Sequence, residues 1–213
     1  VDENVIRFWI DRASQTNNPV LKARYSGLVW DFGKKISSIK LSHNIARIYI
    51  KSLIEIVENR LQNEIDLIQK IERAFSVAVS INSKELTNKS KKVMLHLEEE
   101  IGENGKPGLW GFSFDTLIEN SKSQLTKNEQ TKILAILEQR LLEATSKNKI
   151  NTWASENVIN RLAPYYRKRN KIDDAQRVIR IHGDAVKNRK EYAMLLQYQK
   201  ALKDLQKMYS EYG

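Results

Sequence analysis

The sequence predicts an all-α protein: an array of antiparallel helical hairpins with about nine or ten helices and one packed loop rich in glycine and aromatic residues. Two observations support this fold class. Apolar residues recur three or four positions apart through most of the chain, which places them on one face of a helix. No segment alternates apolar and polar residues as a half-buried strand does. With 213 residues, 41% of them hydrophobic, and only eight glycines and three prolines, the chain can form a large helical core.

Capping residues and apolar spacing set the expected helix boundaries. The second helix begins with Asn18 as its N-cap and Pro19 at its first position, where a missing N–H costs nothing. Ser42 and Ser83 are expected to cap the third and fifth helices, and Thr126 begins a capping box. The expected helices cover residues 3–14, 19–33, 42–57, 61–81, 84–101, 115–120, 127–142, 152–169, 172–188 and 190–212.

The first two helices each have an apolar stripe that we expect to face the core. These stripes are Val5, Phe8, Trp9 and Ile10 in the first helix, and Leu21, Tyr25, Leu28 and Phe32 in the second, which Ala23, Val29 and Trp30 widen. Gly27 lies in the middle of the second helix, where glycine costs roughly 1 kcal/mol relative to alanine. We therefore predict that Gly27 allows another helix to approach closely.

Residues 102–115 differ from the rest of the chain. They contain four glycines, one proline and three aromatic residues, which predicts a compact irregular loop packed onto the helices. We expect residues 1–213 to form one helical domain, with sub-units 1–101 and 115–213 joined by loop 102–114 as the alternative division. Because the chain starts at Val1 without a methionine, we expect it to be a piece of a longer protein.

Residues 156–189 resemble a tetratricopeptide repeat. The leucine, small, tyrosine, alanine and large apolar positions of that motif are occupied by Leu162, Ala163, Tyr166, Ala175 and Ile179. Asn170 stands where the motif usually has glycine, and asparagine tolerates the left-handed conformation needed there. His182 departs from the motif, which has a small residue at that position. The helix pair from Leu21 to Leu53 resembles a looser copy, which favours an array of hairpins over a closed bundle.

The net charge of +10 is concentrated at the C-terminal end. Residues 121–213 have 19 basic and 10 acidic side chains. Nucleic acid is one partner that such a basic region, with Tyr165 and Tyr166 nearby, could contact. A solvated helix face is the alternative explanation. The candidate contacts are Arg167, Lys168, Arg169, Lys171, Arg180 and Lys187.

Most catalytic and metal-binding patterns are missing from the sequence. It has no cysteine, no glycine-rich phosphate loop and no apolar run long enough to span a membrane. The three histidines show no ligand spacing, and we interpret Glu98-Glu99-Glu100 as a solvated helix face. The segment around Ser113 lacks the second glycine and the preceding strand of a nucleophile elbow. We therefore expect no cofactor, no metal and no catalytic residue.

Arg177 and His182 have the Arg-x4-His spacing of HEPN ribonucleases. In those sites the residue after the arginine is usually polar, whereas here it is Val178. The spacing arises easily by chance in a basic helix, and His182 also falls at a packing position of the repeat. We expect no active site there.

Trp110 and Phe112 are the candidate contacts for a protein partner, because aromatic residues dominate interface energetics. The alternative, which we favour, is that they fill a gap between helices.

The chain resembles the helical region that precedes the HEPN-like domain in the domain-of-unknown-function 4209 family, an uncharacterised, largely bacterial group. The resemblance rests on Asn18-Pro19-x-x-Lys-Ala-Arg-Tyr followed by Trp-Asp-Phe, on Lys-Pro-Gly-x-Trp110-Gly-Phe112-Ser-Phe-Asp, and on the helix pair around 162–175. It implies an accessory domain beside one with Arg-Asn-x-x-x-His-Gly, expected beyond Gly213. Residues 177–183 share that spacing but lack the asparagine, so the motif is not transferred to them.

Together these features predict a non-catalytic, cytoplasmic interaction or scaffold domain that positions a protein partner or a neighbouring HEPN-like domain. The alternative is a nucleic-acid-binding module, accessory to an RNase-type domain, that uses the basic 161–190 face. No membrane association and no small-molecule substrate is expected.

Overall fold

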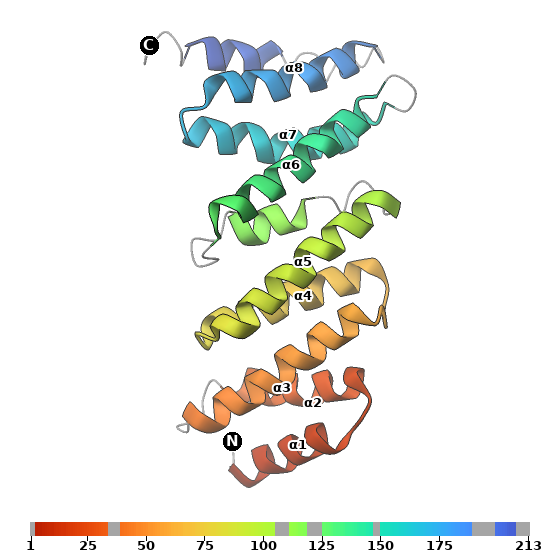
Figure 1. The fold of residues 1–213 in the computed structure, drawn as a ribbon, viewed down its shortest axis with the longest axis vertical. Coiled ribbons are helices and arrows are strands. Elements are labelled where there is room, and N and C mark those ends of the chain that lie inside the picture. Colours follow the sequence, from red (N-terminus) through yellow and green to blue (C-terminus); the bar gives the residue numbers. More distant parts are fainter. Residues whose placement is uncertain are drawn as a thin grey trace. The chain divides into compact units, whose positions relative to one another are not determined.

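The computed structural model describes residues 3–33, 39–104, 111–118, 125–146, 150–188 and 199–207, and no strand occurs in these ranges. The protein is all-α, as predicted. Its elements are α1 (Glu3–Gln15), α2 (Pro19–Gly33), α3 (Ile39–Glu58), α4 (Glu64–Ser80), α5 (Lys84–Asn104), the π-helical turn η2 (Phe114–Ile118), α6 (Lys127–Ala144), α7 (Thr152–Lys168) and α8 (Ile172–Asn188), followed by a helical stretch over residues 199–207 (Figure 1).

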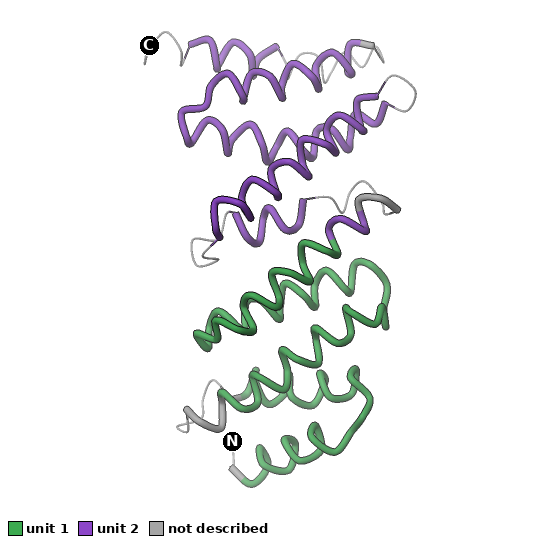
Figure 2. The backbone as a smooth tube through the Cα atoms, viewed as in Figure 1, with its two compact units in different colours: residues 1–97, 120–124 green, residues 98–119, 125–213 purple. Residues whose placement is uncertain are grey.

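The helices form two compact units (Figure 2). The first comprises residues 1–97 and 120–124, and the second comprises residues 98–119 and 125–213. The boundary therefore falls inside α5. The described residues 111–114, expected to belong to the connecting loop 102–114, are part of the second unit.

In the first unit, α1 packs on α2, α2 on α3 and α3 on α4. The start of α2 confirms the predicted cap, because Asn18 Oδ1 accepts from the N–H groups of Val20 (2.9 Å) and Leu21 (3.2 Å). Gly27 also behaves as predicted: a Cβ placed there would lie 2.9 Å from Cε2 of Tyr49 on α3. The largest fully buried side chains of the unit are Ile6, Ile45, Ile50, Ile54, Ile56, Ile71, Phe75, Met94 and Leu97.

The apolar stripes of the first two helices face the core only in part. On α2, Ala23, Val29 and Trp30 are buried as expected, and the buried face also includes Gly27. The prediction was wrong for Leu21, Leu28 and Phe32, which are exposed. The reason is that α2 is apolar on most sides, so its small residues can turn toward α3 and allow the closest packing. On α1, likewise, Val5 and Phe8 are exposed and Ile6 and Ala13 are buried.

Three helix-to-helix turns share one geometry. A residue with positive φ follows the helix. The residue after it donates its backbone N–H to the carbonyl of the residue five positions before that donor, as in a Schellman motif. The left-handed residues are Arg60 (φ 51°), Asn82 (φ 52°) and Asn170 (φ 56°). The predicted left-handed role of Asn170 is therefore confirmed. Ser42, by contrast, lies inside α3, which begins earlier at Ile39, so its predicted capping role was wrong.

In the second unit, α6 packs on both α7 and α8, and α7 packs on α8. The capping box at Thr126 is present, with Glu129 as its partner. Glu138 on α6 accepts from Tyr166 Oη (2.5 Å) and Arg177 Nη2 (2.6 Å), which ties the three helices together. Burial and the Glu138 carboxylate raise the pKa of Tyr166, so its hydroxyl stays protonated and donates. The five repeat-motif positions named above, from Leu162 to Ile179, are all buried.

Candidate interaction surfaces

The six candidate nucleic-acid contacts lie at the end of α7, in the turn after it and along α8, and all six are exposed. Their surroundings are mixed in charge. One exposed face of α8 contains, in order, Asp173, Arg177, Arg180, Asp184 and Lys187. Arg177 also pairs with Glu138 (2.6 Å) and Asp174 (3.3 Å). This face is therefore less basic than its sequence suggests.

The two tyrosines expected to stack on bases do not face solvent. Tyr165 and Tyr166 are buried, and Tyr165 packs edge-on against Phe114 with ring centroids 5.7 Å apart. The guanidinium of Arg169 covers the Tyr165 ring at 3.7 Å from its centroid. The expectation of aromatic stacking beside the basic groups was wrong because these rings fill the core of the unit.

Arg177 and His182 point in different directions. Arg177 is exposed, whereas His182 is only 4% exposed and its Nδ1 lies 2.8 Å from Oγ of buried Ser155. Five residues of helix turn two side chains roughly 140° apart. This geometry does not bring the two side chains to one site.

Glu98 is buried, so its interpretation as part of a solvated face was wrong. It is 2% exposed, and its two carboxylate oxygens accept the backbone N–H groups of Gly111 (2.5 Å) and Ser113 (2.9 Å). Burial raises the pKa of Glu98, against the opposing effect of these hydrogen bonds. Glu99 instead forms an ion pair with Lys132 (2.7 Å).

The Glu98 contact holds the segment of the candidate partner residue Phe112 against α5. Phe112 is 7% exposed and Ser113 is buried, while Gly111 adopts a φ of 88°. Phe112 therefore fills the core of the second unit. Trp110, the other candidate, lies outside the described residues.

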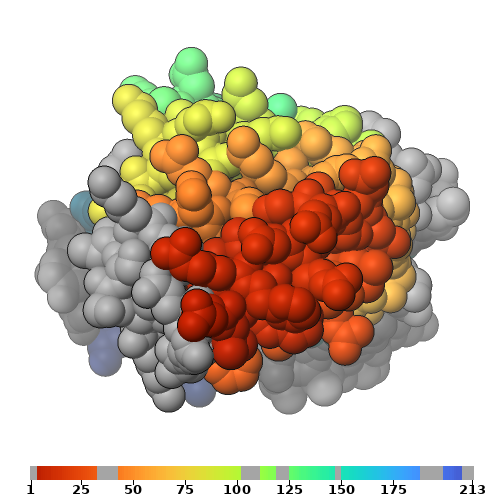
Figure 3. Space-filling model, turned by 90° about the horizontal axis from the view of Figure 1, so that it is seen from below, coloured from red at the N-terminus to blue at the C-terminus, as the bar shows by residue number. Residues whose placement is uncertain are grey.

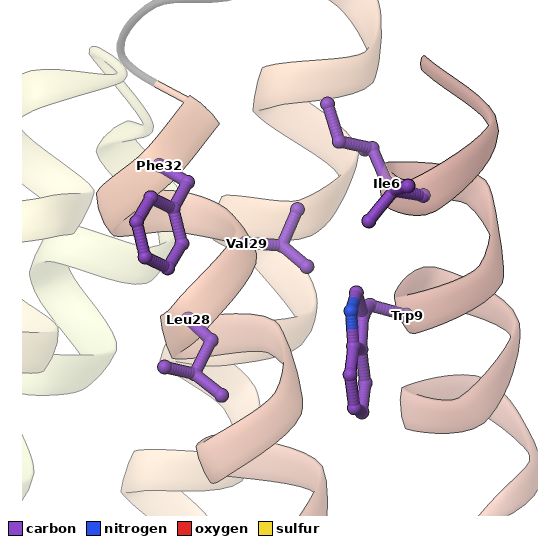
Figure 4. A pocket seen from close by; sticks show the side chains of 6 residues that line it. Ile6, Trp9, Leu28, Val29 and Phe32 are labelled. Atoms are coloured by element: carbon purple, nitrogen blue, oxygen red, sulfur yellow. The ribbon is translucent and has the colours of Figure 1, made fainter. Parts of the chain in front are cut away.

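An apolar pocket of about 330 Å³ lies between α1 and α2 in the first unit. Figure 4 shows side chains of both helices turned toward the space between them. The pocket is lined by Val5, Ile6, Trp9, Leu28, Val29 and Phe32. We call this feature the α1–α2 groove. The sequence analysis missed it because it assigned most of these residues to the core.

The rim of the α1–α2 groove is apolar and open to solvent. Val5 is 48%, Leu28 44% and Phe32 57% exposed, and Phe8, beside Val5 on the outer face of α1, is 51% exposed. In Figure 3 α1 is drawn in red at the surface of this end of the unit. The ring of Trp9 contacts that of Tyr25 with centroids 5.4 Å apart, which fixes α1 against α2.

No known family, curated protein or solved structure matches this chain significantly. Within the described ranges, no helix is long and apolar enough to cross a membrane. Nor do the described histidine, aspartate and glutamate side chains form a group of three that could hold a metal ion.

Proposed function

We propose that this protein is a non-catalytic interaction or scaffold module that binds a protein partner or a neighbouring domain through the α1–α2 groove. The supporting observation is the cluster of exposed large apolar side chains on two adjacent helices around an apolar pocket. Contiguous apolar surface of this kind is costly to leave in water and commonly marks an interaction site. A HEPN-like domain of the same parent protein is one partner that the family resemblance suggests.

Position-specific photo-crosslinking tests this proposal. A photoreactive phenylalanine analogue is placed at Phe8, beside the groove, and in a second protein at Trp153, which is 56% exposed on α7. Both are introduced into the protein in its own cells. We expect protease-sensitive, nuclease-resistant adducts, or a cross-link within the same chain, from position 8 and none from position 153. Adducts at neither position, or equally at both, would refute the proposal.

The second candidate function is nucleic-acid binding by the six exposed cations at the end of α7, in the turn after it and on α8. Fluorescence anisotropy with single-stranded RNA and duplex DNA at two salt concentrations tests it. Binding that weakens steeply with salt and is lost in Arg180→Glu/Lys187→Glu would support it. The matched control is Arg47→Glu/Lys51→Glu, which reverses two exposed cations on α3 of the first unit.

A further inference from the structure

The shape and charge of the α1–α2 groove indicate what kind of partner it binds. We propose that it docks an amphipathic α-helix, which places large apolar side chains in the pocket and an acidic end beside Arg12 and Arg24. This inference rests on the proposed function and names the partner class for the same surface.

The groove suits a helix better than an extended strand. Its walls are two consecutive helices, so their backbone groups are bonded internally and no sheet edge is available for strand addition. A docked helix would instead present residues at i, i+3, i+4 and i+7 to the groove. The groove is also a poor match for a small polar metabolite, because all six lining side chains are apolar and none is charged.

Two arginines mark one end of the groove. Arg12 lies two turns after Val5 on the same side of α1, and Arg24 lies one turn before Leu28 on α2. Since α1 and α2 are joined by the turn at residues 16–18, both arginines lie near that turn. Both are exposed, and the Arg12 guanidinium lies 5.4 Å from the centroid of the Phe8 ring.

Asp11 and Asp31, the acidic residues of these two helices whose side chains the structure describes, do not offset that charge. Asp11 lies roughly 120° around α1 from Val5, on the side away from the groove. Asp31, which shares a side of α2 with Arg24, is paired with Arg73 of α4. The turn end of the groove is therefore cationic, which favours a partner helix with acidic residues at the facing end.

Selection from a displayed peptide library tests the proposal. The library presents randomised peptides of 15 residues, the length of α2, in helical and in proline-containing extended frameworks, and is selected on the full 213-residue chain. The enriched peptides are synthesised and their Kd values measured by anisotropy. The variants are Phe32→Asp, Arg12→Glu/Arg24→Glu and the matched control Ile65→Asp, which replaces an apolar side chain 51% exposed on α4. Circular dichroism verifies that each variant is folded.

We expect the enriched peptides to be helical. They should have apolar residues at positions i, i+3 or i+4, and i+7, together with an excess of Asp and Glu. Phe32→Asp should weaken their binding at least about tenfold and Arg12→Glu/Arg24→Glu about fivefold, while Ile65→Asp changes it less than about twofold. Enriched peptides whose binding depends on Phe32 but which are extended or basic would overturn the proposal of a helical, acidic partner and would still support the groove as an interaction surface. Enriched peptides whose binding is unchanged by Phe32→Asp, or a selection without enrichment, would overturn both the helical partner and the interaction surface.

Discussion

Gly27 sets how closely α2 and α3 approach each other. Its missing side chain leaves room for the Tyr49 ring. A Cβ at position 27 would lie 2.9 Å from Cε2 and 3.0 Å from Cζ of that ring. A helix-interior glycine is otherwise unfavourable, so the packing gain has to exceed the propensity cost of roughly 1 kcal/mol.

Gly27→Ala should therefore destabilise the protein by about 1 kcal/mol, although alanine is the better helix former. Urea unfolding measures the change. The matched control is the same substitution in a Tyr49→Ala background, where the clash is absent and alanine should stabilise. Stabilisation by Gly27→Ala in the wild-type background would show that the Tyr49 contact does not limit the helix approach.

Asn170 is held in the left-handed conformation at the turn between α7 and α8, with φ of 56°. Asn170→Ala should lower the free energy of unfolding by about 1 kcal/mol, because a Cβ without a polar side chain is disfavoured there. Asn170→Gly, which adopts this conformation without strain, should leave stability nearly unchanged or raise it. Equal effects of alanine and glycine in thermal unfolding would contradict the left-handed requirement.

At the scale of elements, the buried Glu98 carboxylate links α5 to the segment that begins at Gly111. The neighbouring Arg161 of α7 donates to Asp115 through Nε (2.8 Å) and Nη2 (2.7 Å). A Cβ at Gly111 would lie 2.9 Å from Cδ of Arg161, so this glycine also permits the close contact with α7. Polar contacts as well as apolar burial thus hold residues 111–115 in place within the second unit.

The pKa of Glu98 is raised in the folded protein because burial disfavours its charged form. The folded state then holds this proton more tightly than the unfolded state, so the stability contribution is present at low pH and is lost as pH rises through the folded pKa. On going from about pH 7 to about pH 5, wild-type should gain stability relative to Glu98→Gln, as measured by urea unfolding. A relative loss on acidification would mean that the Gly111 and Ser113 amides outweigh burial.

For the molecule as a whole, local signals in the sequence predicted the helices well. α8 covers the predicted residues 172–188, and the caps at Asn18 and Thr126 are present, because caps and turns depend on neighbours in the chain. The all-α class followed from apolar spacing in the same way.

The candidate site could not be predicted from local signals. α2 is apolar on most sides, so spacing alone could not show that Leu28 and Phe32 face solvent while Val29 and Trp30 face the core. The burial of Glu98 depends on a segment thirteen residues later in the chain. Likewise, the positive charge of Arg177 on α8 is compensated by Glu138, which lies on a different helix.

Hydrogen–deuterium exchange on the chain alone and in the complex purified from its own cells tests the central claim most directly. Amide exchange reports which surface becomes protected on binding. We predict slower exchange in the complex over residues 5–12 and 21–32, on the two helices of the α1–α2 groove, and no change over residues 167–187. Protection confined to residues 167–187 would contradict the account and would favour the basic face as the functional surface.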